Sequence, residues 1–312
     1  MTQNILVTGA AGYIGSVMVP ALLEKGFSIT ALDLFPRGDA ALLPCCAHAN
    51  FTPVKGDVRD EALMKGLVAK ADIVIQLAAV VGAPLCKRDP LNAQTINSDA
   101  VRMLLKIMSK SQKLLYPATD SAYGISPKGS VCTEETPLNP ITLYGTSKVE
   151  AERAIVENGN GICFRLATVF GLSPRMRFDL LVNDYTYRAL TDRSVIVFDG
   201  HLRRYYVHVR DVVKAFVHGL DNIETMIGQV YNVGLASANL TKLELCAKIK
   251  EHIPDLVYYE SPDGEDWDKR DYFVSPAKLE ATGWTPDWTL DIGIEELMRG
   301  CVMLRNNVYG NV

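Results

Sequence analysis

The sequence predicts an α/β fold in which a doubly wound parallel sheet is joined to a smaller, interleaved C-terminal domain. Two observations carry this prediction. In the first half of the chain, short apolar runs of strand length alternate with helical patterns, as in a parallel sheet covered on both faces. A glycine-rich turn follows the first of these runs and leads directly into a helix start.

The first half of the chain supplies six strands and three main helices. Each predicted strand is a short apolar run, and the helical patterns lie between such runs. We expect strands at residues 5–8, 28–33, 51–55, 73–77, 113–116 and 162–166, and helices at 16–25, 91–109 and 144–157.

In the second half this alternation ends, arginines and aromatic residues cluster, and loops lengthen. The stretches 207–219 and 229–233 again have the character of a helix and a strand, and we expect them to return to the first sheet. The predicted domains are therefore residues 1–168, with returns at 207–233, and residues 169–312. Further helices are expected at 178–190, 241–252 and 292–304.

Composition limits the possible functions. The chain has 312 residues, 48% of them hydrophobic and 22% charged, which is typical of a globular protein with one large or two modest domains. Its net charge of −4 provides no basic field for nucleic acid. The seven cysteines include no C-x-x-C pair and the five histidines show no ligand spacing, so we expect reduced thiols and no metal. Without a signal-peptide pattern or a long apolar run, we expect a cytoplasmic protein with no membrane partner.

The N-terminal segment ILVTGAAGYIG has the pattern of a strand, a tight turn and a helix start. Gly9 permits the turn, Gly12 allows the backbone to approach a pyrophosphate, and Gly15 allows the helix to pack closely on the strand. The helix N-terminus offers free N–H groups and a positive dipole to the diphosphate. The spacing is G-x-x-G-x-x-G. It predicts a Rossmann-type dinucleotide site whose contacts include Gly9, Gly12, Tyr13 and Ile14.

Asp33 closes the second predicted strand, where a carboxylate can accept hydrogen bonds from both hydroxyls of an adenosine ribose. The same charge repels a 2′-phosphate, which favours NAD over NADP. Arg37 is a counter-signal, although an arginine in a loop is more often solvated.

Other candidate cofactor contacts follow the third and fourth strands. Asp57 and Val58 are placed to meet the edge of the adenine, and an ordinary helix N-cap is the alternative. Leu77, Ala78 and Ala79 stand at the end of the fourth strand, where the backbone can lie against the cofactor. Core packing explains these small residues equally well.

Tyr144 and Lys148 are four residues apart and share one face of a predicted helix. An unperturbed tyrosine ionises near pH ~10, so a tyrosine base at neutral pH needs a nearby cation to stabilise its phenolate. An isolated Y-x-x-x-K pattern is common, and a tyrosine packed beside a solvated lysine is then the better interpretation. The glycine turn and Thr119, at workable distances in the sequence, favour the catalytic interpretation.

Together these motifs resemble the extended short-chain dehydrogenase/reductases, the NAD-dependent sugar-nucleotide epimerase/dehydratase family. The resemblance covers nearly the whole chain, through TGAAGYIG, GDVRD, QLAA, ATDSAYG, PLNPITLYGTSK, FRLATVFG, RRYYVHVRD, YNVG and LEATGWTP. The stretches VGAPLCKRDP, ATVFGLSPRMRFDLLVND and GEDWDKRDY are similar to a subgroup that oxidises C4 of a GDP-linked manno-heptose in capsule biosynthesis.

The resemblance implies a role for each residue of the catalytic pattern. Tyr144 matches the base that takes the proton of the sugar C4 hydroxyl while a hydride moves to the nicotinamide. Lys148 matches the lysine that lowers the pKa of this tyrosine and holds the nicotinamide ribose. Thr119 matches the Ser/Thr that hydrogen-bonds the same hydroxyl, and the alternative is a β-branched residue that merely ends a strand.

Asp120 and Ser121 bear on the type of reaction. Family members that remove water across C5 and C6 carry an acid and then a glutamate after the threonine. Here Asp120 fills the acid position, but Ser121 stands at the position of the C5 base, and a neutral hydroxyl is a poor base without a helper. We therefore expect oxidation at C4 without dehydration, with Asp120 as a substrate contact or a capping or turn residue.

Arginines are expected to hold the diphosphate of the substrate, because the guanidinium fork matches phosphate oxygens. Arg204 matches the phosphate-binding arginine of the family, and Arg270 and Arg175 are further candidates. Asn183 is expected to touch the diphosphate or its sugar, with a solvated helix position as the alternative. The sequence departs from the family at Thr168, where many members carry an asparagine that contacts substrate.

The family also implies a homodimer that pairs through the helices at 91–109 and 144–157 in a four-helix interface. The apolar positions of these helices would serve an internal core equally well.

We therefore predict an NAD-dependent enzyme that acts on a nucleotide-diphospho-sugar, most closely a GDP-heptose 4-dehydrogenase. A nucleotide-sugar 4-epimerase similar to UDP-glucose 4-epimerases, with NAD recycled in place, uses the same residues and is the alternative. A non-catalytic NAD-binding sensor is a third interpretation, which the intact Thr119, Tyr144 and Lys148 disfavour.

Overall fold

The computed structural model describes residues 3–36, 40–127, 129–264 and 268–304. The chain forms two compact units, neither of them continuous in sequence. The first consists of Met1–Thr119, Thr142–Arg165 and Val213–Tyr231, and the second of Asp120–Ile141, Leu166–Val212 and Asn232–Val312.

The first unit is built on a seven-stranded sheet with the strand order β10-β6-β5-β4-β1-β2-β3. Its strands are β1 (Asn4–Thr8), β2 (Ser28–Asp33), β3 (Phe51–Lys55), β4 (Ile73–Gln76), β5 (Lys113–Thr119), β6 (Gly161–Leu166) and β10 (Val230–Val233). The pairs β1–β2, β2–β3, β1–β4 and β4–β5 are parallel. The order runs outward in both directions from β1 and β4, as in a doubly wound sheet, so the predicted fold class is confirmed.

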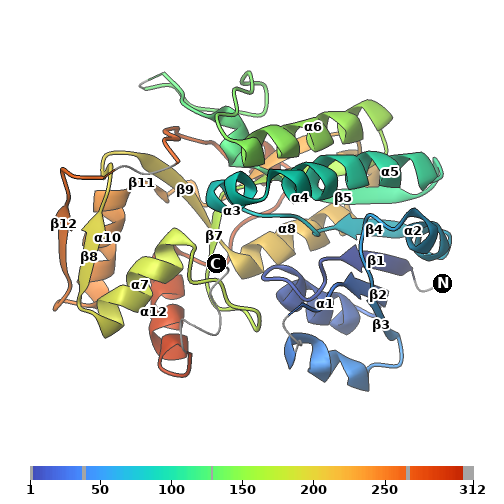
Figure 1. Cartoon of the computed structure of the whole chain (residues 1–312), viewed down its shortest axis with the longest axis horizontal. Coiled ribbons are helices and arrows are strands. Elements are labelled where there is room, and N and C mark those ends of the chain that lie inside the picture. Colours follow the sequence, from blue (N-terminus) through green and yellow to red (C-terminus); the bar gives the residue numbers. More distant parts are fainter. Residues whose placement is uncertain (1–2, 37–39, 128, 265–267, 305–312) are drawn as a thin grey trace. The chain divides into compact units, whose positions relative to one another are not determined.

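Helices cover both faces of this sheet, with α3–α6 on one side of the strands and α1 and α8 on the other (Figure 1). They are α1 (Gly15–Glu24), α2 (Glu61–Val68), α3 (Ala83–Arg88), α4 (Pro90–Gln94), α5 (Ala100–Ile107), α6 (Leu143–Asn158), α8 (Val209–Asp221) and α9 (Ile223–Met226). Strand β6 shows the two faces, because successive side chains of a strand point to opposite sides. Cys163 is buried in a core cluster with Leu104 of α5 and Ile155 of α6. The ring of Phe164 packs on Phe216 of α8, with 4.7 Å between the ring centroids.

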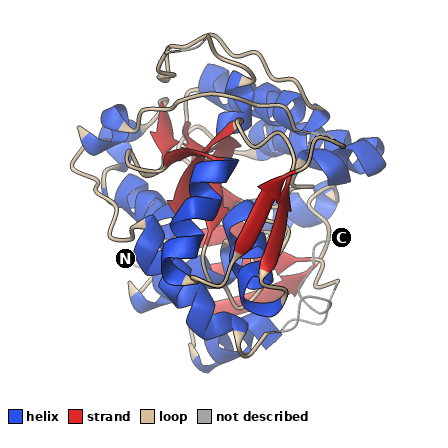
Figure 2. Ribbon diagram, turned by 90° about the vertical axis from the view of Figure 1, so that its left-hand side faces the viewer, coloured by secondary structure: helices blue, strands red, loops and turns tan. Residues whose placement is uncertain are grey.

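The second unit combines small sheets with helices (Figure 2). Its elements are β7 (Thr168–Phe170), α7 (Leu181–Thr191), β8 (Ser194–Val197), β9 (Arg203–His208), β11 (Asn239–Thr241), α10 (Lys242–His252), β12 (Val257–Glu260), α11 (Ala277–Glu280) and α12 (Leu290–Cys301). Strand β9 is antiparallel to β11 and parallel to β7, and β8 pairs in parallel with β12. Helix α10 begins with a capping box in which Thr241 and Glu244 bond each other's backbone N–H groups. In the part of the chain that the structure describes, no helix is long and apolar enough to cross a membrane.

Two helices of the second half start later than predicted. The helix expected at 178–190 begins three residues later, because Phe178 packs from the preceding loop on the ring of Tyr187, with centroids 4.5 Å apart. The helix expected at 207–219 begins only after β9, whose aromatic and β-branched residues pair with strands on both sides. All six strands predicted in the first half are present, with ends displaced by at most three residues. The segment expected at 229–233 supplies β10.

Candidate active site

The glycine turn between β1 and α1 is closely packed against its surroundings. Gly9 has a φ of +64°, and a Cβ on it would lie 2.7 Å from the backbone nitrogen of Ala78, so both conformation and contact require glycine. A Cβ on Gly15 would lie 2.4 Å from the carbonyl oxygen of Ala10. Gly15 thus makes room for the turn itself, rather than for the helix–strand contact that the sequence predicts.

Gly12, Tyr13 and Ile14 lie between this turn and the first residue of α1. The N–H of Gly12 donates to the carbonyl oxygen of Gly9 at 3.1 Å, and the Gly12 carbonyl accepts from the N–H of Ser16 at 2.9 Å. No side chain in the described chain caps the N-terminus of α1, so its N–H dipole remains available to an anion. The residues of this turn therefore fit the pyrophosphate of a dinucleotide.

Asp33 ties the end of β2 to the glycine turn. One carboxylate oxygen accepts a hydrogen bond from the N–H of Ala11 at 3.0 Å, and the other accepts from the N–H of Phe35 at 2.9 Å. The side chain is half-buried at the carboxyl end of the strand, where a ribose binds in doubly wound sheets. Arg37, the counter-signal to NAD, lies outside the described residues.

Asp57 and Val58 follow β3. Both carboxylate oxygens of Asp57 accept hydrogen bonds from the guanidinium of Arg59, at 2.6–3.1 Å, and this bonding lowers the pKa of Asp57. The N-cap of α2 is Asp60, whose side chain accepts from the N–H of Leu63, so the N-cap alternative for Asp57 is wrong. Val58 is buried in the core of the first unit.

The segment after β4 is held against β1 by the side chain of Thr8, the last residue of β1. The hydroxyl of Thr8 donates to the side-chain oxygen of Gln76 at 2.8 Å and accepts from the N–H of Ala78 at 3.3 Å. Leu77, Ala78 and Ala79 are half-buried. They lie at the point where the strand order reverses between β1 and β4, the usual place for a ligand in this sheet type.

The three residues of the predicted catalytic pattern belong to the first unit. Helix α6 starts at Leu143 because the side chain of Thr142 accepts the N–H of Gly145 at 3.1 Å. Tyr144 is half-buried in the first turn, and Lys148 is buried one turn later on the same face. Thr119 is the last residue of β5 and is buried.

Burial is the main influence on the charge of Lys148. It lowers the pKa of the ammonium to about 7, while Cys163, Cys86 and Glu152 act weakly in the opposite direction. The nitrogen lies 3.9 Å above the centre of the Tyr116 ring. Amine and ammonium are therefore both populated near neutral pH, unlike in an exposed lysine.

Asn97 is a buried residue near this pattern that the sequence argument missed. The helix expected at 91–109 is interrupted by a π-helical turn over Thr95–Asp99, a feature frequent at functional sites. The Asn97 amide bonds both backbone groups of Val80, at 2.8 and 2.9 Å, and donates to the hydroxyl of Ser147 at 3.2 Å. It thus joins the loop after β4 to α6, between Tyr144 and Lys148. The available signal is a polar Asn-Ser pair within an apolar helical stretch.

In the second unit, Asp120 and Ser121 open a short 3₁₀ helix and are bound to Arg270. One guanidinium nitrogen of Arg270 lies 3.2 Å from a carboxylate oxygen of Asp120 and also bonds the hydroxyl of Ser121 and, at 2.8 Å, that of Tyr272. A second carboxylate, Asp268, bonds the guanidinium at 2.6–2.7 Å. Burial raises the pKa of Asp120 to about 6, although the charge of Arg270 opposes this.

The other predicted substrate ligands are also engaged within the second unit. The buried guanidinium of Arg204 donates to the backbone carbonyls of residues 203, 268 and 270 at 2.5–2.8 Å. Arg175 is half-buried and donates to the carbonyl of Met176 at 2.9 Å. Asn183 is fully buried, and its amide bonds the N–H of Gly171 and the carbonyl of Arg177, both at 2.9 Å. The solvated position considered for Asn183 is therefore wrong.

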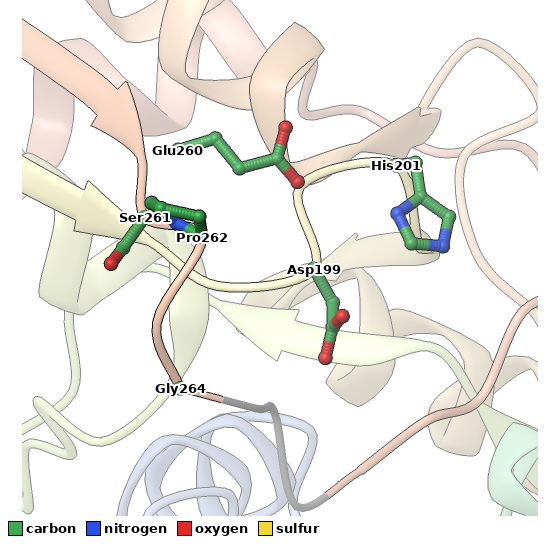
Figure 3. Close-up of a pocket in the computed structure, with 6 residues that line it drawn as sticks. All are labelled: Asp199, His201, Glu260, Ser261, Pro262 and Gly264. Atoms are coloured by element: carbon green, nitrogen blue, oxygen red, sulfur yellow. The ribbon is translucent and has the colours of Figure 1, made fainter.

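A pocket of about 390 Å³ lies elsewhere in the second unit (Figure 3). It is lined by Asp199, His201, Glu260, Ser261, Pro262 and Gly264. The carboxylate of Glu260 accepts the N–H of Gly200 at 2.7 Å, and the Asp199 side chain points away from it. None of the predicted site residues lines this pocket.

Comparison with known proteins identifies the family. Residues 5–234 match the NAD dependent epimerase/dehydratase family. The chain belongs to this family. Its cofactor is NAD, which confirms the prediction from Asp33 and the glycine turn.

Individual relatives cover nearly the whole chain. It is 30% identical over 307 residues to a UDP-glucose 4-epimerase of Mycolicibacterium smegmatis, covering 94% of this chain and 96% of the relative. It is 29% identical over 308 residues to the low-salt glycan biosynthesis protein Agl12 of Haloferax volcanii, with the same coverage of 94% and 96%. Among solved structures, a UDP-glucose 4-epimerase of Thermotoga maritima with UDP-glucose is 27% identical, with a TM-score of 0.81 over 95% of this chain and 97% of that one.

Proposed function

We propose that this protein oxidises C4 of a nucleotide-diphospho-sugar with NAD, as a GDP-heptose 4-dehydrogenase. The observation that carries the oxidation is the placement of Tyr144 and Lys148 one turn apart on α6, with Thr119 at the end of β5. The choice of a GDP-linked heptose is supported by the resemblance of three sequence stretches.

Each of these side chains has one task in the proposal. The phenolate of Tyr144 accepts the proton of the C4 hydroxyl. The ammonium of Lys148 stabilises that phenolate and binds the nicotinamide ribose. The hydroxyl of Thr119 hydrogen-bonds the C4 oxygen and steadies its developing charge. Bound NAD supplies the hydride acceptor.

The cofactor would lie along the carboxyl ends of β1, β2, β3 and β4. The turn residues Gly9, Gly12, Tyr13 and Ile14 would hold the pyrophosphate. The carboxylate of Asp33 would accept the ribose hydroxyls with the lone pairs that Ala11 and Phe35 leave open. Asp57 and Val58 would contact the edge of the adenine. The backbone of Leu77, Ala78 and Ala79 would lie against the cofactor.

The diphosphate of the substrate would be bound by Arg204, Arg270 and Arg175, with Asn183 at the diphosphate or its sugar. Arg204 and Arg270 already bond internal oxygens. Phosphate binding would therefore have to compete with these internal bonds. Such competition favours an ionised phosphate over a neutral sugar hydroxyl, because the guanidinium bonds a charged acceptor more strongly.

A nucleotide-sugar 4-epimerase is the second candidate, and two of the three named relatives are UDP-glucose 4-epimerases. Both candidates share the oxidation at C4 and the same three residues. They differ in whether the 4-keto sugar leaves or is reduced again from its other face. Dehydration is disfavoured because Ser121 replaces the C5 base and is bonded to Arg270.

The test is to incubate the pure protein and NAD with GDP-manno-heptose, GDP-mannose and UDP-glucose. The recovered sugar nucleotides are then analysed by mass spectrometry, and NADH is measured by absorbance. A ketone two hydrogens lighter than the substrate, with one NADH per ketone, is the expected result. An unchanged mass with a new retention time and no net NADH would establish the epimerase instead. No change with any substrate would contradict both.

The control for this test is Tyr144→Phe. Loss of the base should reduce turnover by roughly 10²–10⁴-fold. Tyr259→Phe, at an exposed position of β12, should leave turnover unchanged. Equal activity in both variants would remove Tyr144 from the mechanism.

We further propose that the protein is a homodimer that pairs through α4–α5 and α6. Apolar side chains remain accessible there, with Leu91 72%, Leu143 37% and Val156 38% exposed. Sedimentation velocity over a range of concentrations tests this: a species of twice the chain mass is expected, and its loss in Val156→Glu would place α6 in the interface.

A further inference from the structure

The surroundings of Lys148 are unusual for a buried cation. The residue is 3% exposed, and the face of the Tyr116 ring lies 3.9 Å beneath its nitrogen. Within the described chain, no carboxylate forms an ion pair with this ammonium. The face of an aromatic ring carries partial negative charge and attracts a cation within about 6 Å of its centre, most strongly where water is excluded.

The other titratable groups around the ammonium do not replace the ring. Glu152, one turn further along α6, bonds Arg165 of β6 through two hydrogen bonds of 2.7 and 3.0 Å. Burial raises the pKa of the Cys163 thiol on β6, and that of Cys86 on α3 to about 11, so both remain neutral. Tyr144, the group that the ammonium is proposed to serve, lies one turn before it on α6.

Tyr116 itself stays neutral. Its position on β5 is 1% exposed, and burial raises the pKa of the phenol well above its ordinary value. The hydroxyl has no hydrogen-bond partner among the described residues. The side chain therefore offers its surroundings an uncharged ring face, and the atom that touches this face is the nitrogen of Lys148.

We propose that the ring of Tyr116 is a positioning residue of the reaction, because it holds the Lys148 side chain in place and stabilises its charged form inside the core. This inference rests on the proposed function, in which a charged Lys148 stabilises the phenolate of Tyr144. Burial alone drives the lysine toward its neutral form. The ring opposes this tendency without placing a carboxylate beside the catalytic tyrosine.

The first experiment reverses the partial charge on the face of the ring and preserves the shape of the ring. Tyr116→Phe keeps the ring and removes only the unpartnered hydroxyl. Pentafluorophenylalanine at the same position has a ring face of reversed polarity. The ¹³Cε resonance of Lys148, assigned by its disappearance in Lys148→Met, is titrated in the full-length protein with NAD. We expect the titration of the Phe variant to match the wild type, and that of the fluorinated variant to lie about one pH unit lower. Equal titrations in the Phe and fluorinated variants would overturn the inference.

The second experiment links the ring to turnover. The pH profile of turnover on the active sugar nucleotide should fall on its alkaline side where Lys148 loses its proton. In the fluorinated variant, this limb should shift to lower pH together with the titration of the resonance. In Tyr116→Phe it should remain at the wild-type pH. A limb that stays in place while the resonance shifts would overturn the positioning role. Absence of turnover in the wild type on every sugar nucleotide would instead overturn the proposed function, and the resonance would still decide whether the ring holds the ammonium.

Discussion

Two cations, the buried Lys148 in the first unit and the half-buried Arg270 in the second, have opposite surroundings. Lys148 faces an aromatic ring, and burial lowers its pKa to about 7. Burial alone would also lower the pKa of Arg270, but Tyr272, Asp268 and Asp120 raise it well above its ordinary value. The first cation can gain or lose its proton near neutral pH, whereas the charge of the second is fixed.

This difference separates two uses of a positive charge. The ammonium that is proposed to stabilise the Tyr144 phenolate is left without a carboxylate partner among the described residues, because a carboxylate would compete with the phenolate for its charge. A group that organises a site needs a constant charge and fixed geometry, which paired carboxylates and an arginine fork provide. The same distinction separates Lys148 from Arg165 of β6, which forms two hydrogen bonds with Glu152.

The largest expected effect comes from removing the unpaired cation. Lys148→Met should reduce turnover by roughly 10²–10⁴-fold and should raise the melting temperature, because a buried ammonium without an ion pair is lost. The native protein releases this proton near pH 7, while the unfolded chain keeps it to about pH 10. Wild-type stability therefore rises with pH across this interval, and its deficit relative to the variant should shrink. Thermal melts of both proteins from pH 6 to pH 9 measure this, with exposed Lys106→Met as the control. A lower melting temperature in Lys148→Met than in the wild type at pH 6 would contradict the view that the unpaired ammonium destabilises the fold.

Removal of the paired cation should act in the opposite direction. Arg270→Gln leaves the buried Asp120 and the half-buried Asp268 without their guanidinium, which should lower the free energy of unfolding by about 3–5 kcal/mol. Denaturant titration measures this loss. The control is Arg203→Gln at an exposed position, where we expect a change below about 1 kcal/mol. Similar losses in both variants would mean that Arg270 is not held as the structure shows.

Asp120 tests the same cluster through pH. Its pKa is raised to about 6 by burial, whereas an unfolded aspartate ionises near pH ~4. Between these values the native state binds a proton that the unfolded state lacks, so this group's contribution to stability falls as pH rises from about 4 to about 6. The stability of the wild type relative to Asp120→Asn should drop by about 2 kcal/mol across this interval. Urea melts at closely spaced pH values check this, and a constant difference would show that Asp120 is ionised throughout.

The smallest effects should come from the two helix caps. Thr142→Ala removes the N-cap of α6 and Thr289→Ala removes that of α12, each at a cost of about 1 kcal/mol in stability. Only the first cap lies beside Tyr144, so only Thr142→Ala should also lower turnover, by a few-fold. Paired stability and turnover measurements on the two variants test this. An equal loss of turnover in both would show that the N-cap of α6 does not position Tyr144.

The parts of the fold and site that could be predicted from the sequence depend on local geometry. Tyr144 and Lys148 share a helix face because of their spacing, and Gly9 marks a turn that only glycine can adopt. The strand–helix alternation similarly predicted the order of elements in the first unit. These features require no knowledge of distant residues.

The rest depends on partners that the sequence does not place. Arg270 meets Asp120 across 150 residues of chain, and Arg204 bonds backbone carbonyls 64 and 66 residues away. Motif matching identifies such arginines as phosphate ligands but cannot show that their guanidinium groups are already engaged. The π-helical turn and the contacts of Asn97 were missed for the same reason, because they depend on a loop elsewhere in the first unit.

The division of the chain into units also limits how this protein can diversify. The chain passes between the two units after residues 119, 141, 165, 212 and 231. A single recombination event therefore cannot exchange either unit as a cassette, and a fragment that ends near residue 168 lacks β10 and α8. Exchange of one whole unit would need a crossover at each of these five boundaries, so substitutions and loop insertions within an intact gene are the shorter route to a new specificity.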